Sequence, residues 1–454
     1  MDKELRKTSK NDFTQGRIFS PLLRFSLPVL GAMVLQALYG AVDLYVVGKY
    51  GTAADVSAVA TGAQLMHFFT GFIVGFTVGT TVLIGQSLGA GKDDEAGYAI
   101  GASIKIFGTM GLVLMTAVPL LADRLCALMN APEAAFGKTV DYVTVCTLGA
   151  LLIVSYNVLG SVFRGMGDSK TPLLAVSIAC AANIFGDLYL VRELGMGAKG
   201  AAIATVAAQG LSVVLCVIII ARRGLPFAFG KKHLGRHPGT AGRIMSLGFP
   251  IAFQDLLVSF SFMVIISIVN SMGLVVSAGV GVAEKVCAFI MLAPSAFSQS
   301  LSSFVAQNIG AGRPDRARLA LRYGILASLS LGVIMAYTAF FHGDLLTGIF
   351  TADPEVSAAA WDYLKAYAID TLLVSFMFCF TGYYNGSGFT RFVMIQGLIG
   401  AFGVRIPFSW FMSRQVPVSV FKVGLATPAS TAVQILLCVL YFRRALAENE
   451  RRAQ

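Results

Sequence analysis

The feature that most constrains this chain is a series of long apolar runs separated by short polar connections. Twelve runs can be recognised, near residues 22–48, 56–84, 97–120, 139–162, 172–191, 200–221, 244–270, 276–304, 319–341, 360–383, 392–412 and 419–442. About 20 apolar residues suffice to cross a membrane as an α-helix. Only 13% of the residues are charged, about half the share in soluble domains. The runs predict an all-α polytopic membrane protein with 12 transmembrane helices.

The net charge of +11 could indicate a nucleic-acid-binding protein, but the distribution of basic residues indicates membrane topology. If the N-terminus is cytoplasmic, the cytoplasmic segments hold most of the lysines and arginines. The opposite side holds only Lys49, Arg124, Lys138, Arg192, Lys199 and Arg414. This bias follows the positive-inside rule. We therefore expect a multi-pass inner (cytoplasmic) membrane protein with both termini cytoplasmic, in contact with membrane lipid and without a nucleic-acid partner.

The chain also repeats itself. QSLGAGKDDEA at 86–96 returns as QNIGAGRPDRA at 307–317, and FRGMG at 163–167 returns as YNGSG at 384–388. Matches at one spacing indicate a duplication. Each copy holds six helices, so the copies run in parallel and we expect them to surround a central cavity. The predicted organisation is an N-lobe at 1–221, a basic cytoplasmic linker at 222–243, and a C-lobe with a short basic tail at 244–454.

The GAGK sequence at 89–92 looks like part of a phosphate-binding loop but lacks the rest of that motif. Gln86 stands where a Walker A loop needs its first Gly, and Asp93 stands where it needs Ser or Thr. We interpret both GAG loops as glycine-rich helix ends. The four histidines and seven cysteines show no metal-ligand spacing, and the cysteines are expected to be small core residues. We expect no metal, no catalytic residue and no cofactor other than H⁺ or Na⁺ as coupling ion.

The first apolar run contains one carboxylate, Asp43, preceded by Gln36 and Tyr39 at spacings that place all three on one helix face. A charge inside a membrane span is costly and by default functional. The alternative is a buried stripe of hydrogen bonds that holds helices together. Pro28 leaves a carbonyl without its helical partner, so it marks a point where the helix can bend.

A second polar site lies in the fifth run, where Asn183 and Asp187 share a helix face. Counted from the cytoplasmic ends of their helices, Asp43 and Asp187 lie at similar depth, in the outer half of the bilayer. Two such carboxylates could share protons or bind Na⁺. A structural Asp–Asn pair is the alternative for Asp187.

The second half of the chain does not repeat these acids but has its own. They are Asp255 in the seventh run, Glu284 in the eighth and Asp370 in the tenth, all near the middle of the membrane. Lys285 adjoins Glu284 but points in another direction on a helix. These acids form either a further C-lobe cation site or a set of paired structural charges.

The whole chain resembles the multidrug and toxic compound extrusion (MATE) family, in its bacterial DinF-like branch. The resemblance rests on the doubled six-helix plan, the stretch from Pro28 to Asp43, both Q-x-x-GAG-[KR] loops, FRGMGDSKTP after the fourth run, and Asn183-x-x-x-Asp187. It implies that Asp43 responds to H⁺ or Na⁺ and that Pro28 is a hinge. The other residues that fall where such proteins place the N-lobe polar site are Gln36, Tyr39, Asn157, Asn183 and Asp187.

Together these observations predict a secondary antiporter, acting as a monomer by alternating access. It would export amphipathic, cationic organic compounds or drugs in exchange for H⁺ or Na⁺. The alternative is a flippase for lipid-linked precursors from the same superfamily, which would need a wide, basic cavity. A membrane enzyme is a third hypothesis, but the sequence shows no nucleophile–base or metal constellation to support it.

Overall fold

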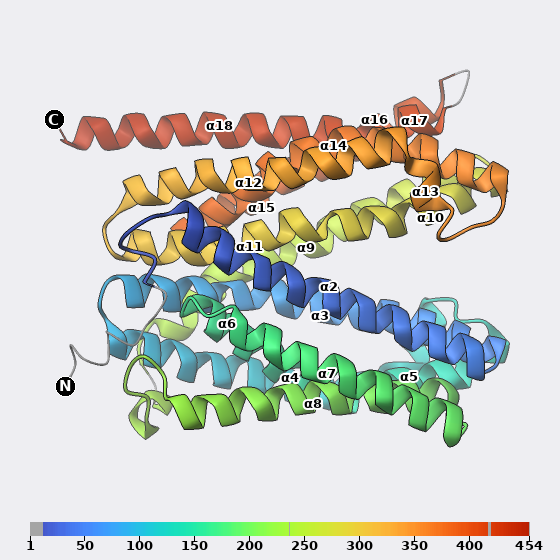
Figure 1. Ribbon diagram of the computed structural model, residues 1–454, viewed down its shortest axis with the longest axis horizontal. Coiled ribbons are helices and arrows are strands. Elements are labelled where there is room, and N and C mark those ends of the chain that lie inside the picture. Colours follow the sequence, from blue (N-terminus) through green and yellow to red (C-terminus); the bar gives the residue numbers. More distant parts are fainter. Residues whose placement is uncertain (1–11, 236, 416–418, 454) are drawn as a thin grey trace. The chain divides into compact units, whose positions relative to one another are not determined.

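The structure, a computed structural model, describes residues 12–235, 237–415 and 419–453, with the side chains of 445–453 left out (Figure 1). The basic residues expected at the extreme N-terminus and in the C-terminal tail therefore lie largely outside the described part. Helices account for nearly all of the described residues, and none of these residues forms a strand.

Contacts divide the chain into two compact units. The first is formed by Arg24–Ala252, Ala306–Arg313 and residues 12–16, and the second by Arg17–Leu23, Phe253–Val305 and the chain from Pro314 onward. The linker at 222–243 thus belongs to the first unit. The predicted N-lobe and C-lobe boundaries remain a prediction.

The helices from the N-terminus to the linker are as follows. They are α2 (Phe19–Tyr50), α3 (Ala53–Gly89), α4 (Asp93–Leu128), the short η1 (Glu133–Ala135), α5 (Phe136–Leu148), α6 (Ala150–Gly165), α7 (Lys170–Asp187), the π-helix η2 (Leu188–Glu193), α8 (Gly197–Arg223) and the short η3 (Lys231–Leu234). In this unit α7 packs against α8, and both α3 and α4 pack against α5 and α6.

The remaining helices follow η3. They are α9 (Thr240–Asn270), α10 (Leu274–Ile290), α11 (Leu292–Gly310), α12 (Pro314–Phe341), α13 (Gly343–Thr347), α14 (Pro354–Ser387), α15 (Thr390–Leu398), the π-helix η4 (Ile399–Arg405), α16 (Ile406–Ser413), α17 (Val420–Gly424) and α18 (Ala426–Ala453). In the second unit α14 is the central helix, because α10, α12 and α18 all pack against it.

Eleven helices of the described chain are long and apolar enough to cross a membrane, or twelve if one bent pair counts as a single span. The bent pair is Glu133–Leu148 with Ala150–Gly165, which meet at an angle of 52°. It replaces the single helix expected near 139–162. Gly149 lies at the break, where an added Cβ would overlap the side chain of Val206.

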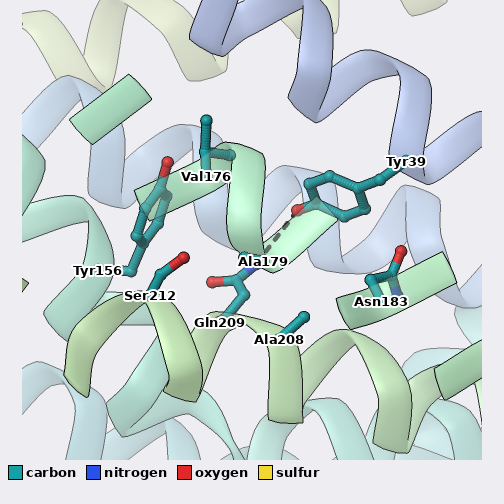
Figure 2. Close-up of a pocket in the computed structure, with 8 residues that line it drawn as sticks. All are labelled: Tyr39, Tyr156, Val176, Ala179, Asn183, Ala208, Gln209 and Ser212. Atoms are coloured by element: carbon teal, nitrogen blue, oxygen red, sulfur yellow. Dashed lines mark hydrogen bonds between the residues drawn. The ribbon is translucent and has the colours of Figure 1, made fainter. Parts of the chain in front are cut away.

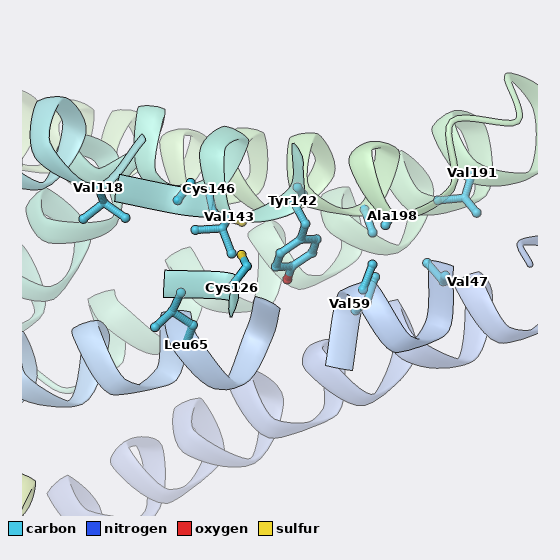
Figure 3. Packing of buried hydrophobic residues seen from close by; sticks show 14 of the residues in the cluster. Val47, Val59, Leu65, Val118, Cys126, Tyr142, Val143, Cys146, Val191 and Ala198 are labelled. Atoms are coloured by element: carbon cyan, nitrogen blue, oxygen red, sulfur yellow. The ribbon is translucent and has the colours of Figure 1, made fainter. Parts of the chain in front are cut away.

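The first unit contains a large apolar cluster formed by α2, α3, α4, α5, η2 and α8 (Figure 3). Tyr142 lies within it, and its ring fills the space in which Gly62 would carry a Cβ. Cys126 and Cys146 belong to the same cluster. All seven cysteines are buried and free, so the prediction that they are small core residues is confirmed.

The repeated loops of the sequence also repeat in the backbone. Gly91 and Gly312 have φ values of +72° and +67°, and Gly167 and Gly388 have values of +81° and +87°. In each loop the residue after this glycine donates its N–H to the carbonyl five residues earlier, at 2.8–2.9 Å. This is the glycine C-cap geometry of α-helices. The interpretation of the GAG loops as helix ends is therefore confirmed.

The two GAG loops also contact each other reciprocally within the first unit. A Cβ on Gly89 would overlap the carbonyl oxygen of Gln307, and a Cβ on Gly310 would overlap that of Gln86. The side-chain amide of Gln307 donates to the carbonyl of Gly165 at 3.0 Å. In each GAG loop the last glycine therefore ends a helix, and the first glycine allows two backbones to come into contact.

Part of the linker is folded onto α4. The buried ring of His233 lies over Gly97 and its backbone carbonyl lies over Gly101, so that neither glycine has room for a Cβ. Its Nε2 atom is 3.1 Å from Oδ1 of Asp94, which also accepts a hydrogen bond from Lys232 Nζ at 2.8 Å. The hydrogen bond to Asp94 raises the pKa of Lys232. The basic linker is thus attached to the first unit by a specific set of contacts.

A buried carboxylate joins three helices at the start of α3. Asp55 Oδ2 accepts hydrogen bonds from Lys138 Nζ at 2.7 Å and from the backbone N–H of Thr52 at 2.9 Å. Its Oδ1 accepts from the N–H of Ala198 at 3.1 Å. These contacts connect α3 to the beginnings of α5 and α8. Such charge-assisted hydrogen bonds are stronger than neutral ones.

We expect Asp55→Ala to lower the free energy of unfolding by about 2 kcal/mol, because two backbone N–H groups lose a charged acceptor. Lys138 is half-exposed and regains hydration, which keeps the loss below that of a fully buried pair. The measurement is the thermal midpoint of the detergent-purified protein. Asp362→Ala is the control, since the exposed Asp362–Lys365 pair should contribute less than about 1 kcal/mol. Equal midpoints for the two variants would contradict the stabilising role assigned to Asp55.

Candidate functional site

The polar face expected on α2 makes contacts with two other helices of the first unit. Gln36 Nε2 donates to the hydroxyl of Tyr156 on α6 at 3.0 Å. The hydroxyl of Tyr39 accepts from Gln209 Nε2 on α8 at 3.3 Å. These hydrogen bonds match the expectation of a stripe that holds helices together, and they fix the direction in which α2 presents Asp43.

Asp43 is 4% exposed, and its Oδ2 atom accepts a hydrogen bond from Thr205 Oγ1 on α8 at 2.9 Å. On α7, Asp187 and Asn183 are fully buried and lie close enough to Asp43 to interact with its carboxyl. The structure therefore brings together the three residues predicted to bind the coupling ion.

Polar atoms in this cluster are left without partners. Within the described part of the chain, Oδ1 of Asp43, both carboxylate oxygens of Asp187 and both side-chain polar atoms of Asn183 have no hydrogen-bond partner. Buried polar groups normally have one, and each exception needs an explanation. Four of these five atoms are oxygens, which are the atoms that a proton or Na⁺ would bind.

A small pocket lies next to this cluster (Figure 2). Its walls come from α2, α6, α7 and α8, and the lining residues are Tyr39, Tyr156, Val176, Ala179, Asn183, Ala208, Gln209 and Ser212. Figure 2 shows the Gln209 amide reaching toward the Tyr39 hydroxyl across the pocket. Asn183 belongs to both the pocket and the acid cluster, so it connects the two.

Two predicted N-lobe residues lie apart from this arrangement. Asn157 donates to the carbonyl of Ile153 in its own helix at 2.8 Å and does not line the pocket, although its neighbour Tyr156 does. Pro28 lies inside α2, which continues as a helix on both sides of it. The cavity role of Asn157 and the hinge role of Pro28 remain predictions.

The three acids of the second unit are placed differently from one another. Asp370 on α14 is 1% exposed, Glu284 on α10 is half-buried, and Asp255 on α9 is exposed. Asp370 interacts with Thr431 and with the buried Arg405, whereas Glu284 interacts with Tyr363 and Tyr367. A common site for all three acids remains a prediction.

Several residues of the acid cluster and its neighbouring pocket, and Arg405 in the second unit, were not predicted from the sequence. Thr205, Gln209 and Ser212 lie at helical spacing in the run near 200–221, a polar stripe that the spacing rule could have found. Tyr156 adjoins the predicted Asn157, but the register of α6 directs Tyr156 toward α2. Arg405 is the basic residue inside the run near 392–412 and could have been noticed as an intramembrane charge.

Comparison with known proteins extends these observations. The family model described as MatE matches residues 28–188 and 250–411. A "Probable multidrug resistance protein YpnP" of Bacillus subtilis (strain 168) is 27% identical over 435 residues, 95% of this chain and 96% of the relative. A "Probable multidrug resistance protein NorM" of Thermotoga maritima is 23% identical over 440 residues, 95% of this chain and 94% of the relative.

Solved structures share the fold. An "Outward-facing conformation of a multidrug resistance MATE family transporter of the MOP superfamily" aligns with a TM-score of 0.91 and 18% identity, covering 97% of this chain and 99% of that one. A "MOP superfamily transporter from Pyrococcus furiosus" aligns with the same TM-score and identity, covering 96% and 98%. The "reverse polarity" of the binding pocket of that protein suggests a different function for it.

The fold and the family match define a multi-pass membrane protein of a transporter class. The chain belongs to the MatE family, since the family model covers both halves of it. The predicted membership of the MATE family and the predicted fold of two six-helix repeats are therefore confirmed. The DinF-like branch remains a prediction.

Proposed function

We propose that this protein is a secondary antiporter that exports amphipathic, cationic organic compounds in exchange for H⁺ or Na⁺ by alternating access. The names of its relatives as multidrug resistance proteins support drugs as substrates. We further propose that it acts as a monomer in the inner membrane with both termini cytoplasmic. The proposal includes no cofactor other than the coupling ion, H⁺ or Na⁺.

The observation that carries the proposal is the pair of buried carboxylates, Asp43 and Asp187, beside Asn183. Two negative charges in a low-dielectric interior repel each other strongly unless one of them binds a proton or a cation. Within the described residues, no Lys or Arg is among the groups that act on either carboxylate. The pair can therefore change its charge state by binding a small cation and releasing it.

The pocket supports a cationic, amphipathic substrate class. Its lining combines the aromatic rings of Tyr39 and Tyr156 with the amide of Gln209 and contains no basic residue. Aromatic faces attract organic cations, and a nearby carboxylate pair attracts the same charge. A substrate cation and the coupling cation would then compete for one negatively charged region, which is the requirement for exchange.

The test is efflux of a small panel of cationic dyes from proteoliposomes that contain the full chain. A pH gradient alone is compared with a Na⁺ gradient alone, with no other driving force. We expect one of the two gradients to drive efflux well above that of protein-free liposomes. If neither gradient drives efflux of any dye, the antiporter assignment is wrong.

The alternative, a flippase for lipid-linked precursors, predicts a basic cavity for anionic headgroups. The lining of the described pocket favours the antiporter. The same proteoliposomes discriminate between the two functions, because a flippase would translocate a fluorescent anionic lipid analogue without need of a gradient.

A further inference from the structure

The second unit contains a buried positive charge that the proposed mechanism does not use. Arg405 is the last residue of the π-helix η4 and is 5% exposed. Its Nη1 donates to Ser261 Oγ on α9 at 3.2 Å, and its guanidinium lies 4.4 Å from the centre of the Phe262 ring. A cation held inside a membrane span is expensive, so it needs a compensating charge and by default has a function.

The compensating charge comes from the acids of the same unit. Arg405 interacts electrostatically with Asp370 and with Tyr367, both on α14. Glu284 acts on the same tyrosine from α10. Among the described residues, Arg405 Nε and Asp370 Oδ1 have no hydrogen-bond partner. The two buried charges therefore act on each other, while each keeps an atom without a hydrogen-bond partner.

The two halves of the chain differ in whether a basic residue is present at this position. At the spacing of the repeat, Arg405 corresponds to Ile184, which is next to Asn183 in α7. The helix that supplies Asp187 to the acid cluster of the first unit therefore has a counterpart in the repeat, and that counterpart supplies Arg405 near Asp370 in the second unit. π-helical segments occur often at functional sites, and in this chain one begins directly after Asp187 and the other ends at Arg405.

We propose that Arg405 is the fixed cation of the acid cluster in the second unit. Its guanidinium takes the electrostatic role that an exchangeable monovalent cation would otherwise have beside Asp370. The coupling ion therefore binds at the Asp43–Asp187 pair and not beside Asp370. This inference rests on the proposed function and specifies which acids take part in coupling and which do not.

The experiment measures equilibrium binding of radioactive sodium to the full chain purified in detergent. Asp43→Asn serves as the background, because it removes the site of the first unit. In this background, Arg405→Gln should raise the affinity for Na⁺ by about tenfold or more, since a repelling unit charge at short range in a low-dielectric interior costs at least that factor. Adding Asp370→Asn should remove the gain. Arg405→Lys keeps the positive charge and should show no gain.

Two results would overturn the proposal. One is a folded Asp43→Asn/Arg405→Gln protein that binds Na⁺ no better than Asp43→Asn. The other is Na⁺ binding in Asp43→Asn itself that is lost on adding Asp370→Asn while Arg405 is intact. This second comparison remains decisive if Arg405→Gln does not fold. Neither measurement involves transport, so failure of this inference is distinct from failure of the antiporter proposal.

Discussion

Asp43→Asn is expected to reduce gradient-driven efflux to the level of liposomes without protein, while the protein remains folded. Asn has almost the same shape as Asp, and its side-chain carbonyl can still accept the hydrogen bond from Thr205. What it lacks is a charge that H⁺ or Na⁺ can neutralise. Without that change of charge, the gradient has no means of favouring one state of the transporter over the other.

The measurement is dye efflux from proteoliposomes under whichever gradient drives the unmodified protein. Asp315→Asn is the matched control, because Asp315 is 88% exposed and forms its ion pair with Arg318, one turn away. It should leave efflux unchanged. Undiminished efflux by a folded Asp43→Asn protein would show that Asp43 is a structural residue, and the Asp43–Asp187 site would have to be abandoned.

Gly89→Ala is expected to destabilise the protein by about 3 kcal/mol or more, which is the upper range for overpacking. An added Cβ would overlap the carbonyl oxygen of Gln307 and come within 2.8 Å of its carbonyl carbon. Both are backbone atoms, so no side-chain rotation can relieve the overlap. Gly310→Ala should have a similar effect, since it meets the backbone of Gln86 in the same way.

The thermal midpoint in detergent tests this expectation, and Gly71→Ala provides the control. Gly71 is also in α3, but nothing lies within 4 Å of the Cβ that Ala would add there. Because Ala favours a helix over Gly by about 1 kcal/mol, Gly71→Ala should raise the midpoint or leave it unchanged. A Gly89→Ala protein as stable as Gly71→Ala would mean that the reciprocal contact of the two loops does not form.

The positions of the spans could be predicted from sequence because lipid imposes a strong rule. A helix in the membrane satisfies its own backbone hydrogen bonds, so a long apolar run has few other choices. This rule does not predict where the helix within a run is interrupted. The fourth run forms two helices that meet at Gly149, where Val206 lies close by. This is a contact between distant parts of the chain, so local hydropathy does not predict it.

The first half of the candidate site could also be predicted, since helical spacing places Gln36, Tyr39 and Asp43 on one face. The residues on other helices that contact this face could not be predicted. Thr205 lies 162 positions from Asp43 in the chain, and no local pattern states that α8 should pack beside α2. Arg405 could be recognised as an intramembrane charge, but for the same reason its interaction with Asp370 on α14 could not be predicted.

Taken alone, the sequence determined that the chain crosses the membrane many times, that it is a duplication, and that a few charges lie at depths where charge is costly. These follow from local properties, namely hydropathy, spacing and repetition. The tertiary structure decided which charges meet, so that Asp43 faces a second acid whereas Asp370 faces a base. That distinction depends on contacts between helices far apart in the chain, and such contacts arise only when the helices pack.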